Sequence, residues 1–532
     1  MTAGLGVLLR LALRRDRVML PVWLYALIGT AASTAVSIRA LYPDQASRDR
    51  LAAGINDNAS LRALYGPVYD THSLGALTAW RVLPFGGVMI GLLCVLLVTR
   101  HTRAEEESGR LELLGAGAVG RAAPLTAALG TALAACAAVA VVVPVLMAAL
   151  GQDLAGSVAF GLAYAGVGLV FAGVSALAAQ LTGTSRAANG IGGALLGAAY
   201  LLRATGDAAG DGGPAWSAWL SPLGWAERVH SYGGDAWWLL GLMLLAAAVP
   251  TAAAYALAGR RDLGGGLLPQ RPGPAAAAPS LRGAYALGWR LQRGSLFGWA
   301  AAFLVSGAVL GGISRGISRL VDGNQQVEQL LRRMGGAEGV VDSYLATIMG
   351  TLGMAAAVYA VQTVLRLRGE EAEGRAEPVL ATAVTRLGWA GSHLLYPLAG
   401  SAVLLLSGGL GAGLGAGAVL GDTGGWTGRL VGAGLVQLPA VWVFAAVTLA
   451  LFGLAPRRTA AGWGVLGALL LIGYLGPALH AGQWLLDLTP FTHVPRLPGG
   501  VLTLRPLLWL TLVSVVLGTA GLLGLRRRDL AG

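Results

Sequence analysis

The sequence contains no lysine and little charge of either sign. All 38 basic residues are therefore arginines, and charged residues make up 12% of the 532-residue chain, about half the share found in a soluble protein. Hydrophobic residues make up 55% of it, and the mean hydropathy is +0.66. A composition this apolar excludes an ordinary soluble domain and predicts a protein that crosses a membrane many times.

The missing lysine also excludes a nucleotide-binding P-loop. That motif, GxxxxGK followed by Ser or Thr, uses its lysine to reach the phosphates of the nucleotide. If ATP drives this protein, its hydrolysis must therefore take place on another polypeptide. We expect no enzyme activity and no cofactor in this chain.

Cysteine and histidine are too few and too scattered to predict a disulfide or a metal site. Cys94 and Cys136 both lie within apolar segments, and the six histidines show no metal-ligand spacing. The formal charge of +12 could suggest nucleic acid, but the arginines stand at the ends of apolar segments rather than along one basic face. We therefore expect no disulfide, no metal and no nucleic-acid partner.

Twelve segments are apolar enough to cross a bilayer, which takes roughly 20 residues. They cover about residues 20–41, 80–99, 124–150, 156–181, 187–203 and 236–258, then 297–314, 345–365, 390–419, 429–454, 461–480 and 505–525. Arginine clusters flank one side of them, from Arg10 to Arg17 at the start and from Arg526 to Arg528 at the end. Because positive charge favours the cytoplasmic side, both termini are expected to be cytoplasmic.

A charged motif occurs twice. Arg103 to Glu112 reads RAEEESGRLE, and Arg368 to Glu377, 265 residues further on, reads RGEEAEGRAE. With that offset, the residues Arg103, Glu105, Glu106, Gly109, Arg110, Glu112 and Arg121 match Arg368, Glu370, Glu371, Gly374, Arg375, Glu377 and Arg386. The run RRDL also ends both halves, at 260–263 and at 527–530.

These matches divide the chain into two halves of six spans. We predict a first unit at 1–263, a Pro/Gly-rich linker at 264–282 and a second unit at 283–532. Six spans in each half give both halves the same orientation. The fold class is therefore an all-α membrane protein with twelve transmembrane helices in two parallel repeats.

The charged motif has two interpretations. Glu105 and Glu112 are seven residues apart and would share a helix face, and Glu106 with Arg110 would form an i,i+4 pair. Gly109 weakens such a helix by about 1 kcal/mol relative to alanine, which suggests a bend or the close approach of another backbone. Taken alone, either copy could be a solvated connector. Its recurrence favours a docking surface for a cytoplasmic partner.

Here the chain resembles the ABC-2 type (type V exporter-like) permeases. The cluster after the second span is similar to their coupling helix, which contacts the ATPase, and would lie at about 103–121 and 368–386. An amphipathic elbow helix before the first span of each unit, and the run SPLGW at 221–225, fit this family too. Two such units in one chain resemble actinobacterial exporters of polyketide antibiotics or multiple drugs. Pro378 in place of Leu113, and the degenerate run TPFT at 489–492, depart from the pattern.

The resemblance implies a function and partners. The chain would be the permease of an ATP-binding cassette exporter in a bacterial cytoplasmic membrane, moving lipophilic compounds. Two copies of an ABC ATPase subunit would bind ATP and Mg²⁺ and dock on the motif, whose candidate contact residues are Glu105, Glu106, Gly109, Arg110, Glu112, Glu370, Glu371, Gly374, Arg375 and Glu377.

Two other classes compete with this interpretation. An ion-coupled secondary transporter would also suit twelve spans in parallel repeats, although it usually places ionisable residues within its spans, and here they are nearly free of Asp and Glu. A channel or a purely structural membrane protein would leave the duplicated charged motif without a role.

The transport path is only weakly marked in the sequence. Gly409, Gly413 and Gly417, at four-residue spacing, indicate close helix packing rather than a pore. Aromatic and polar residues midway along spans could face a substrate cavity or could serve as helix contacts, and these are Phe85, Met89, Tyr359, Gln362, Gln437 and Trp442.

Overall fold

The computed structural model describes residues 3–115, 117, 119–209, 215–261, 265–268, 275–314, 336–475 and 482–529. Within these ranges every regular element is a helix. Ten helices in the described part are long and apolar enough to cross a membrane, and they coincide with ten of the twelve predicted spans. The chain is therefore an all-α, multi-pass membrane protein.

The other two predicted spans are helical where the structure describes them, but neither described helix meets the same criteria of length and apolarity. Residues 187–203 lie in α10 (Ser185–Ala209), which is rich in glycine and alanine and carries Arg203 and Asp207 near its end. Residues 461–480 begin as α22 (Ala461–Leu475), whose continuation at 476–481 lies outside the described residues.

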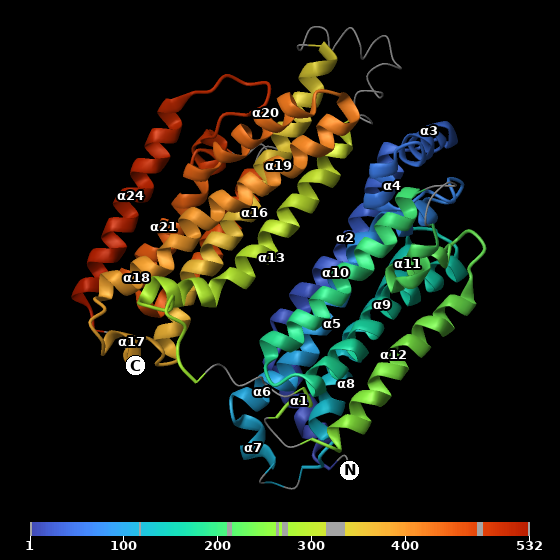
Figure 1. The fold of residues 1–532 in the computed structure, drawn as a ribbon. Coiled ribbons are helices and arrows are strands. Elements are labelled where there is room, and N and C mark those ends of the chain that lie inside the picture. The colour runs from blue at the N-terminus through green and yellow to red at the C-terminus, as the bar shows by residue number, and fades with distance from the viewer. Residues whose placement is uncertain are drawn as a thin grey trace. The chain divides into compact units, whose positions relative to one another are not determined.

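The chain forms two compact units, Met1–Gly273 and Pro274–Gly532, with the boundary inside the predicted linker (Figure 1). Unit 1 contains α1 (Leu5–Arg15), α2 (Met19–Leu41), α3 (Gln45–Asn56), α4 (Ala59–Tyr65), α5 (Leu74–His101), α6 (Arg103–Glu107), α7 (Arg110–Gly115), α8 (Ala123–Ala149), α9 (Leu154–Leu181), α10, η2 (Ala215–Leu220), α11 (Pro222–Arg228) and α12 (Trp237–Ala258). Helix α9 is the centre of this unit, because α5, α8, α10 and α12 all pack on it.

Unit 2 contains α13 (Ala284–Gly312), α16 (Gly336–Ala372), α17 (Ala376–Leu380), α18 (Arg386–Leu395), η3 (Tyr396–Gly400), α19 (Ser401–Leu420), α20 (Thr423–Leu435), α21 (Leu438–Leu454), η4 (Pro456–Arg458), α22, α23 (Gln483–Leu486), η5 (Pro490–His493) and α24 (Leu504–Arg527). Its centre is α21, which packs against α16 and α24 as α9 packs against α5 and α12.

The elbow helix predicted for each unit is separate only in unit 1. There α1 ends at Arg15, and α2 begins at Met19. In unit 2 the corresponding residues form the first turns of α13, which runs without a break from Ala284 to Gly312. The two units therefore differ at their first helix.

The glycines at four-residue spacing in α19 are packing contacts, as predicted. A Cβ added at Gly413 would lie 2.3 Å from the Cα of Thr427, and one at Gly417 would lie 2.4 Å from the Cα of Thr423. Both neighbours belong to α20. Glycine therefore lets these two helices approach until their backbones touch.

Candidate functional site

The charged motif bends at its glycine in both units. Gly109 separates α6 from α7 with φ of 70°, and Gly374 separates α16 from α17 with φ of 68°. No atom lies within 4 Å of where a Cβ would stand at either position. The glycines are thus required by the left-handed backbone conformation and not by close packing. The coupling helices predicted at 103–121 and 368–386 are therefore each interrupted.

Replacing these glycines by alanine should straighten or strain the motif. A left-handed conformation costs a residue with a Cβ about 1–2 kcal/mol, whereas asparagine adopts it more readily. We therefore expect Gly109→Ala and Gly374→Ala to lower the midpoint of thermal unfolding in detergent, and the Asn variants to lower it less. Equal midpoints for the Ala and Asn variants would contradict this explanation.

The second glutamate of each motif is buried in a two-pronged ion pair with an arginine that follows the last helix of its own unit. Arg261, after α12, donates to both carboxylate oxygens of Glu106, with Nη1 2.8 Å from Oε2. Arg528, after α24, donates to both oxygens of Glu371 at 2.6 and 2.8 Å. Each pair joins residues more than 150 positions apart, with separations of 155 and 157.

Two further arginines complete the arrangement in each unit. Arg121 donates to the carbonyl oxygen of Arg261 at 2.7 Å, and Arg386 donates to that of Arg528 at 2.6 Å. The first arginine of the motif also faces the buried glutamate, at 2.7 Å in unit 1 and 3.7 Å in unit 2. We call each set a clasp, made of Arg103, Glu106, Arg121 and Arg261 in unit 1 and of Arg368, Glu371, Arg386 and Arg528 in unit 2.

The bend changes the ion pairs expected within the motif. Arg110 lies 3.6 Å from Glu105, and Arg375 lies 2.9 Å from Glu370, so each arginine pairs with the first glutamate of its motif. The predicted i,i+4 pair of Glu106 with Arg110 is wrong, because it assumed an unbroken helix. The equivalent pair of Glu371 with Arg375 in the second copy is wrong for the same reason. The same break removes the single helix face that Glu105 and Glu112 were expected to share.

The ten predicted contact residues differ in exposure. Arg110, Glu112, Gly374, Arg375 and Glu377 are exposed, Gly109 and Glu105 are half-buried, and Glu106, Glu370 and Glu371 are largely buried by their own unit. The side chains of Glu112 and Glu377 form no hydrogen bond or ion pair with any described residue. A partner could therefore reach the end of each motif but not its second glutamate.

The six predicted cavity residues do not share one environment. Tyr359 and Gln437 are buried among the helices of unit 2, as helix contacts would be, and Tyr359 packs edge-on against Trp299. Phe85, Met89 and Gln362 are exposed. Trp442 lines an apolar groove of about 370 Å³ between η3, α21 and α24.

A similar apolar groove occurs in unit 1. It has a volume of about 250 Å³ and lies between α8, α9 and α12, where Cys136 and Met243 line it. The two grooves lie between corresponding helices, since α18 with η3, α21 and α24 follow the order of α8, α9 and α12 in their own unit. Within each unit, therefore, an apolar surface is hollowed between the third, fourth and last long helices.

A cluster of buried charges lies at the other end of α5, about 40 Å from the clasp of unit 1 by the length of that helix. Arg203 of α10 lies 3.0 Å from Glu227 of α11, and Arg228 lies 3.0 Å from Asp207. Arg203 also donates to the carbonyl oxygens of residues 63 and 64, at 2.8 and 3.1 Å. This cluster was not predicted from the sequence, although the charges of Arg203 and Asp207 at the end of an apolar segment indicate such a site.

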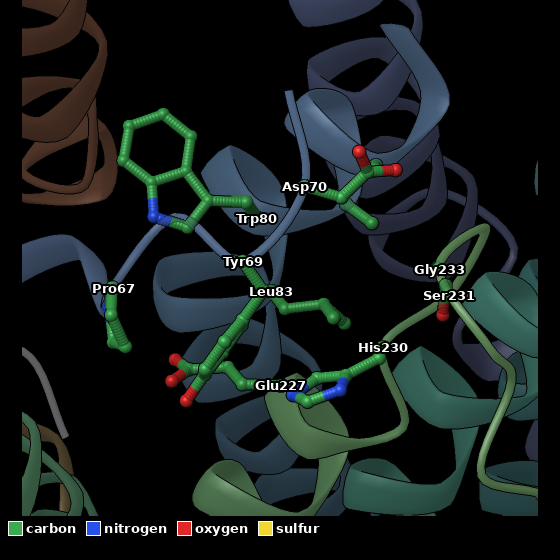
Figure 2. A pocket seen from close by; sticks show the side chains of 11 residues that line it. Pro67, Tyr69, Asp70, Trp80, Leu83, Glu227, His230, Ser231 and Gly233 are labelled. Carbon is green, nitrogen blue, oxygen red and sulfur yellow. The ribbon is translucent and has the colours of Figure 1, made fainter. Parts of the chain in front are cut away.

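A cavity of about 200 Å³ adjoins this cluster (Figure 2). Glu227, His230 and Ser231 line it from α11 and the loop that follows, and Tyr69, Asp70 and Trp80 line it from the start of α5 and the loop before it. Burial, opposed by Arg203, raises the pKa of Glu227 to about 8. Burial and the charge of Arg228 lower the pKa of His230.

These features define a multi-pass α-helical membrane protein that carries the same charged clasp in both of its units. A family model described as the C-terminal domain of the multidrug efflux system permease Rv1217c matches residues 5–258 and 281–526. The multidrug efflux system permease protein Rv1217c of Mycobacterium tuberculosis (strain ATCC 25618 / H37Rv) is 45% identical over 529 residues, which are 99% of this chain and 95% of the relative.

The chain therefore belongs to the family of multidrug efflux system permeases. This membership confirms the prediction that it is the permease of an exporter, which the sequence made from the two copies of the charged motif.

Proposed function

We propose that this chain is the membrane permease of an ATP-driven exporter in a bacterial cytoplasmic membrane. Its two units would be repeats of six spans each with both termini in the cytoplasm. The exposed ends of the two motifs would each bind one copy of an ABC ATPase subunit, which supplies ATP and Mg²⁺. The observation that carries this proposal is the clasp, which recurs with the same residue types at both motifs.

The clasp supports coupling because it connects the motif to several spans at once. Glu106 follows α5, its partner Arg261 follows α12, and Arg121 precedes α8. A force on the exposed part of the motif would therefore be passed to three long helices of the unit. In unit 2 the clasp makes the same connection between α16, α24 and α18.

Two observations support the repeat. One family model matches the chain twice, at 5–258 and at 281–526. The two units also place their clasps, their glycine bends and their apolar grooves at corresponding points of the helix order. Ancestral duplication of one six-span unit would account for both observations.

A lipophilic substrate fits the surfaces that the spans offer. The groove of unit 1 is lined by Leu, Ala, Gly, Met and Cys, and the groove of unit 2 is lined mostly by apolar residues, among them Trp442, together with the hydroxyl residues Thr511, Ser514 and Thr519. A compound would be held there by burial of apolar area, at roughly 25 cal/mol per Å². We propose that such compounds, antibiotics, drugs or lipids, are what the exporter moves.

The alternative of an ion-coupled secondary transporter has one observation in its favour. Asp207 and Glu227 form a buried pair of carboxyl groups, which an ion-coupled carrier would need. Arg203 and Arg228 each bind one oxygen of these carboxyl groups, however, and the cluster does not recur in the described part of unit 2 at Thr489 to Arg496. The ATP-driven exporter therefore accounts for more of the structure.

The exposed glutamates provide a test that leaves the clasp intact. Reversing the charge at both, with Glu112→Arg and Glu377→Arg, should weaken capture of the ATPase by the tagged permease at least about tenfold, because like charges across an interface repel. Asp57→Arg, at an exposed position on the opposite end of unit 1, is the matched control. The unfolding midpoint should stay the same in all variants.

The result can also refute the proposal. If the double variant captures the ATPase as well as the control does, the exposed ends of the motif are not the docking surface. If transport into vesicles runs on a proton gradient without nucleotide, the secondary transporter is correct.

A further inference from the structure

We propose that the cavity beside α11 is a binding site for a small organic cation, such as a protonated amine, with the carboxylate of Glu227 as its counter-charge. The site belongs to unit 1 and lies at the end of α5 opposite the clasp. It therefore does not depend on the proposed docking of an ATPase, and it stands whichever energy source drives transport.

The size of the cavity suits a small molecule. Its volume is about 200 Å³, somewhat more than the roughly 150 Å³ of an engineered cavity that binds benzene. That engineered cavity is dry because its walls are apolar, whereas this one has polar groups from α11 and the loop after it. The occupant is thus expected to combine an apolar body with a polar head.

Three buried polar atoms of the lining residues have no partner. They are Oε2 of Glu227, Nε2 of His230 and Oγ of Ser231, and the carboxyl group of Asp207 lies beside that of Glu227. The side chain of Glu227 is 5% exposed, and its other oxygen is bound by Arg203. Leaving such groups unpaired costs about 1–3 kcal/mol each, so a ligand that donates hydrogen bonds to them would recover that energy.

The charges favour a cation over a neutral or anionic ligand. The lining includes two carboxylates, Glu227 and Asp70, and no arginine. The nearest arginines are not part of the lining. Arg203 is bound to Glu227, and Arg228 is bound to Asp207. An ammonium group offers three donors and no acceptor, which matches a set of acceptor atoms beside an unpaired carboxylate oxygen.

Aromatic rings also line the cavity. Trp80 and Tyr69 both line the cavity, and the Trp80 indole is fixed because its Nε1 donates to the carbonyl oxygen of Gly66 at 2.9 Å. The ring of Tyr69 packs on His230 with centroids 4.2 Å apart. A cation near such rings gains about 0.5–2 kcal/mol from their negative faces.

The backbone of this loop is held in an unusual conformation. His230, Tyr232 and Asp235 have φ of 50°, 74° and 38°, and among the described residues Asp422 is the one other non-glycine residue with positive φ. Such residues cost about 1–3 kcal/mol each and gather at ligand-binding sites. The loop therefore places His230 and Ser231 at the cavity in a backbone conformation that is energetically unfavourable for non-glycine residues.

Binding of benzylammonium to the purified full-length permease in detergent tests the proposal. Titration calorimetry should show saturable binding, with benzyl alcohol and benzoate binding at least about tenfold more weakly because they lack the positive charge. Glu227→Gln should weaken benzylammonium binding at least about tenfold. Asp487→Asn, which removes an exposed carboxylate of unit 2, is the matched control and should bind as the unchanged protein does.

Two further measurements decide the matter if Glu227→Gln does not fold. Tyr69→Ala removes a half-exposed ring and should weaken binding roughly threefold or more. In the unchanged protein, affinity should rise about tenfold per pH unit up to about pH 8 and then level off, because the cation binds the ionised form of a group whose pKa is about 8. Asp207, Arg203, Arg228, His230 and Asp70 are the charged and titratable groups around it.

Three results would overturn the site. Equal affinity for benzyl alcohol and benzylammonium would show that the positive charge does not contribute to binding and that the cavity is merely apolar. A folded Glu227→Gln variant with unchanged affinity would remove the counter-charge from the argument. Absence of binding at millimolar benzylammonium at pH 8 would exclude the site altogether.

Discussion

Glu106→Ala is expected to destabilise the isolated permease by about 3–5 kcal/mol, before any partner is added. Removing one member of a buried ion pair leaves the other charge without compensation. In unit 1 the substitution would remove the carboxylate that binds two arginines. These are Arg103, whose side chain is fully buried, and Arg261, which is 10% exposed. The check is the unfolding midpoint of the purified protein in detergent, measured by size-exclusion chromatography after heating.

The second unit provides a graded comparison. Glu371→Ala should cost less than Glu106→Ala, because Arg368 is 33% exposed and water can solvate its charge. Adding Arg261→Ala to Glu106→Ala should recover part of the loss, because it removes one of the two arginines that faced the lost carboxylate. Glu112→Ala, at an exposed position, should change stability by no more than about 0.5 kcal/mol.

The outcome separates an internal role from a partner-binding role. A stable Glu106→Ala variant that has lost only the ATPase would show that Glu106 contacts the partner directly. A destabilised variant, beside a stable Glu112→Ala, assigns Glu106 to the clasp and Glu112 to the surface.

Arg203→Met is expected to cost a similar amount, about 3–5 kcal/mol, at the other end of unit 1. The side chain of Arg203 is fully buried, and its guanidinium binds Glu227 and two backbone carbonyl oxygens near the end of α4. Methionine fills a similar volume but donates no hydrogen bond. Glu227 would then keep a buried carboxyl group with no cation, and the two carbonyl groups would lose a donor.

A matched arginine and a compensating change complete this experiment. Arg50→Met, on the exposed face of α3 in the same unit, should leave the unfolding midpoint nearly unchanged. Adding Glu227→Gln to Arg203→Met should restore part of the stability, because it removes the stranded charge. If Arg203→Met alone costs less than about 1 kcal/mol, water reaches the cluster and the burial argument fails.

Local patterns in the sequence predicted several parts of the structure correctly. The spacing of Gly409, Gly413 and Gly417 predicted a close helix contact, because small residues at four-residue intervals line one face of a helix. Gly109 and Gly374 predicted either a bend or the close approach of another backbone, because glycine in a polar helix is costly without such a reason, and the structure shows the bend. Both inferences needed only neighbours within one or two turns.

The candidate sites could be predicted only in part. The repetition of the motif predicted a docking surface in the region where the clasps lie, and the RRDL run, which the sequence offered only as a sign of a repeat, contains the arginines that complete them. That Arg261 reaches Glu106 was not predictable, because 155 residues separate them and their contact depends on how the helices pack. The outer cavity is likewise assembled from two segments, around Tyr69 and around Glu227, that no short-range pattern connects.

By itself, the sequence determined that this is a many-spanning membrane protein that carries one charged motif twice and no P-loop of its own. Composition and local periodicity carry that information, since every residue of a span must suit the bilayer. Only the tertiary structure decided which glutamate of each motif is exposed and which is buried. That choice depends on where the last helix of the unit returns, because an arginine arriving from far along the chain withdraws Glu106 and Glu371 from solvent while leaving Glu112 and Glu377 free for a partner.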